Sequence, residues 1–247
     1  MLARPQRTQL NRALSKLGLC SRGVAAAWIA AGRVRVNGEP AVSPEQWVEL
    51  GVDRIEADEP GSGGVAESRP PVYLALHKPP GYVTTRSDEL GRKTVYDLLP
   101  PEYAGGWVFP VGRLDKDSEG LLLLTNDGAW SDRLTDPERH VAKVYRVKLD
   151  GKPRADELER FRGGIELDGS LTAPAEVEAD AECAGWHRVV LTEGRNRQIR
   201  RMFHALGYKV KRLVRVSIGT LELGDLGAGE TRVLPGEAVA ALRKAAR

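Results

Sequence analysis

Cysteine is scarce in this chain of 247 residues, because only Cys20 and Cys183 occur and they lie far apart in the sequence. Two such cysteines cannot form a disulfide framework, and no Cys-x-x-Cys pair offers the ligand spacing of a zinc site. The four histidines are also scattered, and no two of them have the helical spacing of metal ligands. These absences predict a fold without disulfides and without a bound metal.

Long apolar runs are absent as well. No segment approaches the roughly 20 apolar residues that a transmembrane helix needs, and the first residues lack the apolar core of a signal peptide. We therefore expect a cytoplasmic protein that does not associate with a membrane. A Gly-x-x-x-x-Gly-Lys-Ser/Thr phosphate loop is also missing, which disfavours a nucleotide-dependent enzyme such as a helicase.

Acidic residues are missing from two stretches, although the net charge of the whole chain is only +3. No Asp or Glu precedes Glu39, and none lies in 195–215. The first stretch contains Arg4, Arg7, Arg12, Lys16, Arg22, Arg33 and Arg35, and the second contains Arg195, Arg197, Arg200, Arg201, Lys209, Lys211, Arg212 and Arg215. Two local basic surfaces indicate a polyanionic partner, with nucleic acid first, whereas the alternative is two ordinary solvated faces.

Residues 8–60 are predicted to form a small module. Leucines at helical spacing, Leu10, Leu14 and Leu17, indicate a first helix that Gly18 ends. A second helix over 22–31 has Ser21 as its N-cap and buries Ala25, Trp28 and Ile29. A short strand over 33–36 follows, and the pair Asn37-Gly38 is a strong signal for a tight turn.

A linker separates this module from a larger domain. Residues 61–71 are rich in Gly, Ser and Pro, as flexible connections are. Over 72–243, short apolar strands alternate with turns and few helices, with strands predicted at 73–78, 141–149 and 186–191. This pattern indicates an α+β domain with a central mixed, largely antiparallel sheet.

The most informative segment is 112–128, in which a short charged loop lies between two glycines and four leucines follow at once. The leucines predict a buried strand that ends at the turn signal 126–128. Asp115 would thus lie on a loop anchored in the core, a common place for a residue that carries chemistry. A calcium loop is the rival interpretation, but Asn126 stands where an EF-hand needs a bidentate glutamate, so we reject it.

The basic segment 194–207 is predicted to be an amphipathic helix. Its apolar residues recur at the spacing of one helical stripe, namely Ile199, Met202, Phe203 and Leu206. Its arginines spread over the remaining surface.

These segments resemble, in chain order, the motifs of the RNA pseudouridine synthases of the RsuA/RluB/RluE/RluF family. The matching words are Lys-Pro-Pro-Gly at 78–81, Gly-Arg-Leu-Asp at 112–115, Lys-Val-Tyr at 143–145 and Gly-Arg-Asn-Arg-Gln-Ile-Arg at 194–200. The N-terminal module resembles an S4 RNA-binding domain through Leu-Gly-Leu-Cys-Ser-Arg, Ala-Gly-Arg-Val and Val-Asn-Gly. The resemblance implies an S4 module followed by a catalytic domain of the pseudouridine synthase fold.

The chemistry that the resemblance implies needs no cofactor. The uracil of a uridine is detached from ribose C1′, rotated and rejoined through its C5. Asp115 is then the catalytic aspartate, and Tyr145 supplies a ring beside the flipped base. Arg200 is the cation expected to pair with Asp115, with Arg197 as the alternative, and Leu213 is expected to close the other side of the uracil pocket.

The resemblance also implies an RNA surface on both domains. In the module it includes Arg12, Lys16, Arg22 and Arg33, and in the catalytic domain Arg113, Arg197, Arg201, Lys211, Arg212, Leu213 and Arg215. The partner is expected to be ribosomal RNA or a pre-ribosomal particle, 23S in preference to 16S because 116–119 looks closer to the large-subunit enzymes. We expect a monomer. A non-catalytic RNA-binding or ribosome-assembly protein is the alternative, although binding alone has no need of Asp115, Tyr145 and the arginine motif together.

Overall fold

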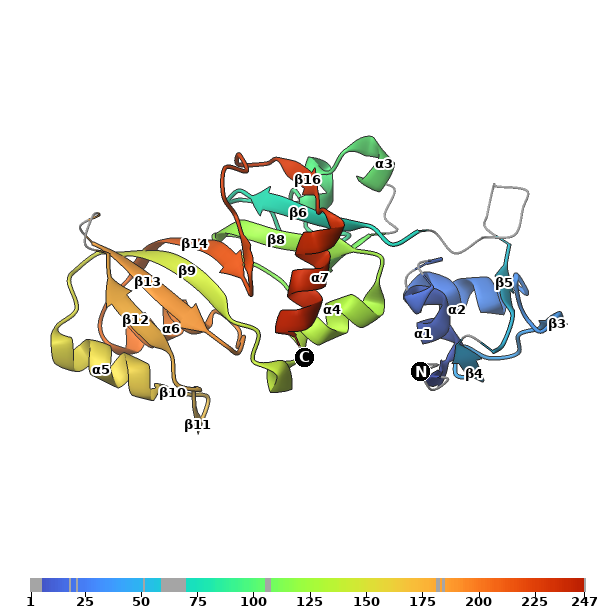
Figure 1. Ribbon diagram of the computed structural model, residues 1–247, viewed down its shortest axis with the longest axis horizontal. Coiled ribbons are helices and arrows are strands. Elements are labelled where there is room, and N and C mark those ends of the chain that lie inside the picture. Colours follow the sequence, from blue (N-terminus) through green and yellow to red (C-terminus); the bar gives the residue numbers. More distant parts are fainter. Residues whose placement is uncertain are drawn as a thin grey trace. The chain divides into compact units, whose positions relative to one another are not determined.

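The computed structural model describes residues 6–17, 19–20, 22–50, 52–58, 70–104, 108–180, 183 and 185–246. These residues fall into two compact units (Figure 1). The first contains the described residues of 1–72, 105–109 and 125–129, and the second those of 73–104, 110–124 and 130–247. The predicted helix end at Gly18, the predicted cap Ser21 and the basic residue Arg4 lie outside the described residues, as does the predicted linker except for Pro70 and Pro71.

The first unit contains the two predicted helices. Helices α1 (Leu10–Lys16) and α2 (Arg22–Ala30) pack together and bury Leu14, Trp28 and Ile29 in a common core. Strand β2 (Val34–Val36) lies between β3 (Glu39–Pro40) and β5 (Ile55–Ala57). Asn37 and Gly38, with φ of 54° and 87°, form the tight turn between β2 and β3, so this prediction is confirmed.

Beyond β2, no strand of this unit was expected from the sequence, and two of the unexpected strands pair with each other. Strand β1 (Gln6–Gln9) pairs antiparallel with β4 (Trp47–Leu50). Both have only four residues, β1 is polar throughout, and their pairing joins segments about forty residues apart, so no local hydrophobic period marks the pair.

The second unit is built on one sheet of nine strands. Their order is β12 (Glu176–Ala179), β13 (Trp186–Leu191), β9 (Lys143–Leu149), β14 (Val210–Ile218), β8 (Glu119–Thr125), β6 (Tyr73–Lys78) and β16 (Thr231–Val233), with β7 (Phe109–Val111) on β8 and β15 (Leu221–Glu222) on β14. Strands β14 and β8 are parallel, whereas β9 pairs antiparallel with both of its neighbours. The predicted α+β fold with a mixed sheet is confirmed.

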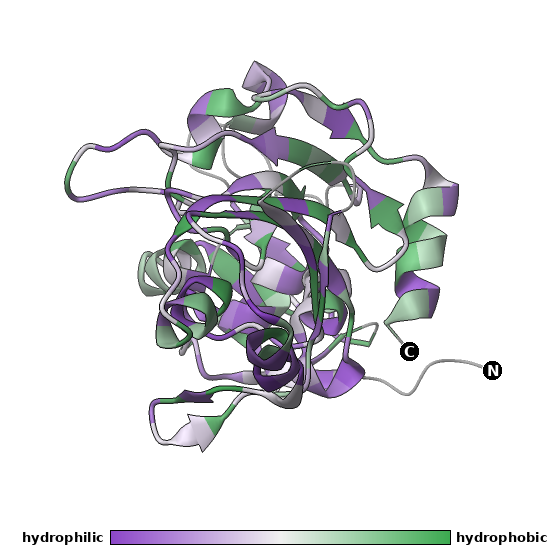
Figure 2. Cartoon of the chain, turned by 90° about the vertical axis from the view of Figure 1, so that its left-hand side faces the viewer, coloured by the Kyte–Doolittle hydropathy of each residue, from purple (hydrophilic) through white to green (hydrophobic). Residues whose placement is uncertain are grey.

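Helices cover this sheet in two places (Figure 1). Helices α5 (Ala155–Gly163) and α6 (Gln198–Ala205) pack against β12 and β14, and the rings of Phe161 and Phe203 meet with centroids 4.6 Å apart. Purple and green alternate along strands in Figure 2. In β9, buried and exposed residues alternate from Tyr145 to Leu149, whereas β8 is buried on both faces from Gly120 to Thr125. The remaining short elements are η1 (Val95–Leu98), α3 (Pro101–Ala104), η2 (Pro137–Arg139), β10 (Glu166–Leu167) and β11 (Ser170–Leu171).

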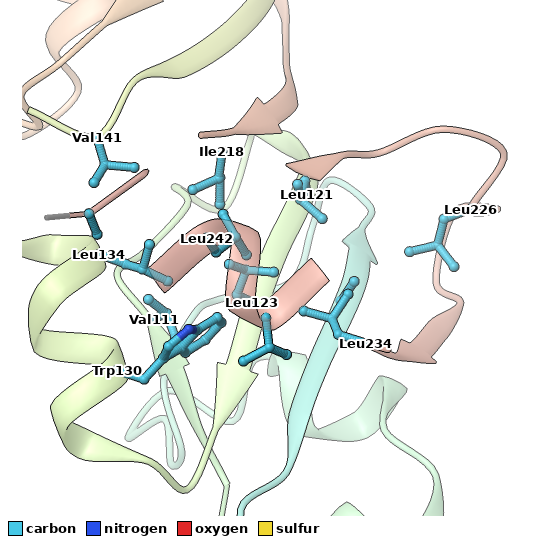
Figure 3. Packing of buried hydrophobic residues seen from close by; sticks show 13 residues of the cluster. Val111, Leu121, Leu123, Trp130, Leu134, Val141, Ile218, Leu226, Leu234 and Leu242 are labelled. Atoms are coloured by element: carbon cyan, nitrogen blue, oxygen red, sulfur yellow. The ribbon is translucent and has the colours of Figure 1, made fainter. Parts of the chain in front are cut away.

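A second core supports the other half of the sheet. Trp130 of α4 (Gly128–Thr135), Leu242 of α7 (Gly236–Ala245) and Leu123 of β8 point toward one another there (Figure 3). All four leucines of β8 are fully buried, so the predicted core strand is confirmed. The loop that precedes β8 and carries Asp115 is therefore anchored in the centre of the unit. No helix among the described residues is both long and apolar enough to cross a membrane.

Gly120 of β8 is required by the close approach of β14. A Cβ at this position would lie 2.2 Å from the carbonyl oxygen of Arg215, and the φ of 106° suits only glycine. We expect Gly120→Ala to lower the free energy of unfolding by about 3–5 kcal/mol, measured by urea denaturation. Gly163→Ala is the matched control, because a Cβ there meets nothing within 4 Å, and its stability should change by less than about 1 kcal/mol. Equal effects of the two variants would contradict this account of Gly120.

Candidate active site

Asp115 lies at the rim of a pocket of about 390 Å³ in the second unit. The walls are the loop before β8, strands β9 and β14, and the loop before α6. Asp115, Tyr145, Leu213, Arg113, Arg197 and Arg215 all line it, so the structure brings together six of the predicted site residues. The Asp115 side chain is 29% exposed, whereas Tyr145 and Leu213 are buried. A partly exposed carboxylate above buried apolar walls suits a flat ligand that enters from solvent.

The cation that pairs with Asp115 is Arg197, and the prediction of Arg200 for this contact was wrong. Arg197 Nη1 lies 3.7 Å from Asp115 Oδ2. Arg200 instead donates to the main-chain oxygens of Asp117, at 2.9 Å, and Val210, at 3.1 Å. Burial and the neighbouring charge of Arg197 lower the pKa of Arg200, while Asp115 and Asp117 oppose this shift. Arg200 thus braces the loop and adds positive charge near Asp115 without touching its carboxylate.

The start of α6 explains why Arg197, and not Arg200, contacts Asp115. The helix begins at Gln198, not at Gly194 as predicted, because Arg197 has a left-handed backbone with a φ of 47°. The side chain of Gln198 accepts a hydrogen bond from the Arg195 N–H at 2.9 Å and donates one to Glu193 at 2.6 Å. Residues 194–197 are therefore a loop, from which Arg197 reaches the carboxylate.

A buried lysine outside the predicted site holds the Asp115 loop. Lys78, the last residue of β6, has no exposed surface. Its Nζ donates to the carbonyl oxygens of Ser118 at 2.7 Å, Pro79 at 3.1 Å and Lys116 at 3.3 Å. Burial lowers the pKa of Lys78 to about 8, against the opposing charges of Asp115, Asp117 and Glu119. The sequence did contain a signal for the burial of Lys78, because the period of two in β6 puts it on the same face as Leu74 and Leu76.

Thr84 was also missed, and it holds the loop from the other side of Asp115. Its Oγ1 donates to the carbonyl oxygen of Leu114 at 2.8 Å and accepts from the N–H of Leu114 at 3.3 Å. The residue before Asp115 is thus tied to the segment that follows β6, and residues after Asp115 are tied to the end of β6 itself. Such support fixes a catalytic group in one position.

Comparison with known proteins assigns this arrangement to a family. The family model described as RNA pseudouridylate synthase matches residues 72–205, and the S4 domain model matches residues 9–52. The chain belongs to the RNA pseudouridine synthase family. The predictions of a pseudouridine synthase and of an N-terminal S4 domain are confirmed.

Individual relatives agree with the family model. The synthase is 36% identical over 242 residues to ribosomal large subunit pseudouridine synthase B of Bacillus subtilis, and 95% of each chain is covered. It is 39% identical over 173 residues to ribosomal large subunit pseudouridine synthase E of Vibrio parahaemolyticus, which covers 64% of this chain and 71% of the relative. A crystal structure of a pseudouridylate synthase superposes with a TM-score of 0.69 at 31% identity, covering 95% of this chain and 99% of that one.

Some of the predicted RNA-contact residues of the synthase are exposed to solvent, whereas others form ion pairs within the protein. Arg113 and Lys211 are exposed. Arg201 forms a double hydrogen bond with Asp168, at 2.6 and 2.8 Å, and Arg212 forms one with Glu119, at 2.8 and 3.0 Å. In the S4 unit, Arg12, Arg22 and Arg33 are exposed and Lys16 is partly exposed. These exposed residues remain predicted phosphate contacts of the synthase.

The burial of Arg215 contradicts the prediction of a surface contact with RNA. Arg215 was expected to contact phosphate at the surface, but it is only 4% exposed and its Nε donates to the carbonyl oxygen of Leu121 at 2.7 Å. Arg215 shares a face of β14 with buried Leu213, two residues earlier, which turns it into the pocket. Among the described residues of the synthase, no group of three or more His, Cys, Asp or Glu side chains could hold a metal ion.

The ion pair of Asp115 predicts how the two arginines differ in function. Arg197 contacts the Asp115 carboxylate and helps to hold it in one position, so Arg197→Gln should slow turnover of RNA by about 10- to 100-fold, and Arg197→Lys should restore part of the rate. Arg200→Gln should chiefly lower stability, because its contacts are main-chain oxygens. Single-turnover rates and urea unfolding of the three variants check this assignment. A normal rate for Arg197→Gln beside an inactive, stable Arg200→Gln would return the role to Arg200.

Proposed function

We propose that this synthase converts uridine to pseudouridine at a specific site in ribosomal RNA of the large subunit, with Asp115 as the catalytic carboxylate. The observation that carries the proposal is the position of Asp115, on a loop fixed on both sides and at the rim of the pocket that Tyr145 and Leu213 line. The names of the two relatives support the large subunit as the substrate.

The geometry supports a division of labour within the pocket. The uracil of a flipped uridine lies between the ring of Tyr145 and the side chain of Leu213, where stacking offsets the cost of leaving the RNA. The ribose then lies at the rim beside Asp115, whose carboxylate is paired with Arg197. In this position the carboxylate acts on the sugar, as nucleophile or as proton acceptor, while the base is held for rotation.

The proposal extends to the setting of the reaction. Residues 8–60 bind structured RNA as the S4 domain, and residues 72–243 carry out the chemistry. The enzyme is proposed to act as a monomer in the cytoplasm, on ribosomal RNA or a pre-ribosomal particle.

Tritium release tests the reaction and the substrate together. Pseudouridine formation frees the hydrogen at uridine C5, because C5 becomes the glycosidic carbon. We expect release from a C5-labelled large-subunit transcript, or from large-subunit precursor particles, and none from the small-subunit equivalents. Release from the small-subunit RNA alone would overturn the choice of subunit. No release from any RNA or particle would overturn the proposed activity.

A further inference from the structure

Besides the exposed Arg113, two cations line the active-site pocket without a carboxylate partner among the described residues. They are Arg215 of β14 and Lys143, the first residue of the neighbouring strand β9. The Nε of Arg215 donates a hydrogen bond to the carbonyl oxygen of Leu121, while its buried Nη2 has no hydrogen-bond partner. Lys143 is half-buried, and its Nζ donates to the carbonyl oxygen of Val141 at 3.1 Å. Each therefore keeps hydrogen-bonding capacity that protein groups do not use.

The charge of the pocket points to an anionic ligand. Five basic side chains and two acidic ones line it. The acids are already matched, because Asp115 pairs with Arg197 and Glu193 lies 3.4 Å from Arg195. Burial, followed by the positive charge of Arg215, lowers the pKa of Lys143. A ligand with negative oxygen atoms would offset the repulsion between Lys143 and Arg215 and would accept a hydrogen bond from the unused Nη2 of Arg215.

The walls around the two cations favour a base over a phosphate group. Tyr145, Leu213, Leu134 and Ile218 give this part of the pocket a flat and apolar lining. Arg215 stands directly opposite Tyr145 in the β9–β14 ladder, so its side chain lies beside the ring on which the base is proposed to stack. The groups available there are the carbonyl oxygens O2 and O4 of the uracil.

The chemistry supplies the negative charge. When the bond between N1 and C1′ breaks, its electron pair stays with the uracil, and the charge spreads over N1, O2 and O4. When C5 then bonds to C1′, the C5 hydrogen leaves as a proton and N1 takes up a proton. We propose that Arg215 and Lys143 bind the carbonyl oxygens of the target uracil and stabilise the charge that it carries while it is detached from the ribose. This inference rests on the proposed function.

Lys143→Gln is the first test, with Arg215→Gln beside it. We expect the single-turnover rate on the substrate RNA to fall by about 100-fold, while the RNA dissociation constant from filter binding stays within about 3-fold, since the contacts form only with the flipped base. Lys148→Gln, on the exposed face of the same strand, should match the wild type in both measurements. Lys143→Gln carries the test alone if Arg215→Gln fails to fold, because Arg215 also holds Leu121.

A modified base separates charge stabilisation from a structural effect. Fluorine at C5 withdraws electrons and stabilises the detached uracil anion without help from the protein. We expect the defect of Lys143→Gln to shrink by at least about 10-fold when 5-fluorouridine replaces the target uridine. Loss of the target nucleoside, measured by chromatography of nuclease digests, reports both substrates. An equal defect on both bases would mean a structural role and overturn the inference.

The remaining outcomes are also decisive. A weaker RNA affinity with a normal rate at saturation would mean that the two cations bind phosphate, which contradicts the inference. A normal rate for Lys143→Gln in an active wild-type background would contradict it as well. Failure of the proposed function is distinct from both, because the wild-type synthase would then be inactive on every RNA and particle.

Discussion

Replacing Asp115 with asparagine is expected to abolish pseudouridine formation while leaving the affinity for RNA close to that of the wild-type synthase. The substitution keeps the size of the side chain and removes its charge. The contacts of Lys78 and Thr84 that hold the loop use main-chain groups of residues 114, 116 and 118, so they do not depend on the Asp115 carboxylate. We therefore expect the single-turnover rate to fall by about 10⁴-fold or more, since neither nucleophilic attack nor proton transfer is open to an amide.

Asp117→Asn is the matched control for this variant. Asp117 lies two residues away on the same loop, its side chain is 65% exposed, and it too lies near Arg197, at 3.9 Å. Its loss changes the local charge by the same amount, yet the rate should stay within about 3-fold of the wild type, because an exposed ion pair of this length contributes little. Tritium release and filter binding on the same RNA measure both properties. Asp115→Asn turnover above a trace level would remove Asp115 from the catalytic role.

Much of the fold could be predicted because its central elements carry strong local patterns. The four leucines of β8 are buried on both faces, and the period of two in β9 matches its buried residues Tyr145, Val147 and Leu149. Strands β1 and β4 could not be predicted in this way, because their pairing is nonlocal and each has only four residues.

The candidate site was predictable in its residue types but not in its side-chain directions. The segment 194–207 has a helical apolar stripe, which predicts one continuous helix but does not show which of its arginines reaches the Asp115 carboxylate. One left-handed residue at 197 breaks that helix at its start, and such a backbone leaves no mark on hydrophobic periodicity. Arg215 was misplaced for a different reason, because a run of basic residues suggests exposure even where strand alternation places one of them beside a buried leucine.

Lys78 is expected to control activity through the Asp115 loop, although it lies beneath the site. Lys78→Met keeps a side chain of similar length and removes the three donations that tie β6 to Ser118, Pro79 and Lys116. The Lys116 oxygen keeps its bond from the Gly81 N–H at 2.8 Å, so the loop loosens without detaching. A displacement of about 1 Å costs about 100-fold in rate, and we expect a fall of that size in the single-turnover rate.

Stability should respond less strongly than activity to this change. Loss of the hydrogen bonds leaves buried carbonyl oxygens without donors, which costs about 1–3 kcal/mol, and the removal of a buried charge offsets part of that cost. Urea unfolding of Lys78→Met at pH 7 should therefore show a loss of about 1–2 kcal/mol. Lys152→Met, at an exposed loop position, should match the wild type in rate and stability. A stable Lys78→Met variant with a normal rate would show that the loop needs no such support.

The pH dependence of stability gives an independent check on Lys78. Its pKa is about 8 in the folded protein and returns toward its ordinary value of 10.5 on unfolding. Between these values the unfolded chain binds more protons than the folded one, so the contribution of Lys78 to stability becomes more favourable as the pH rises. The cost of burying its charge is fully present below pH 8 and is relieved between pH 8 and 10.5. The stability lost in Lys78→Met should therefore grow across this window, whereas a difference that stays constant with pH would mean that Lys78 titrates normally in the folded state.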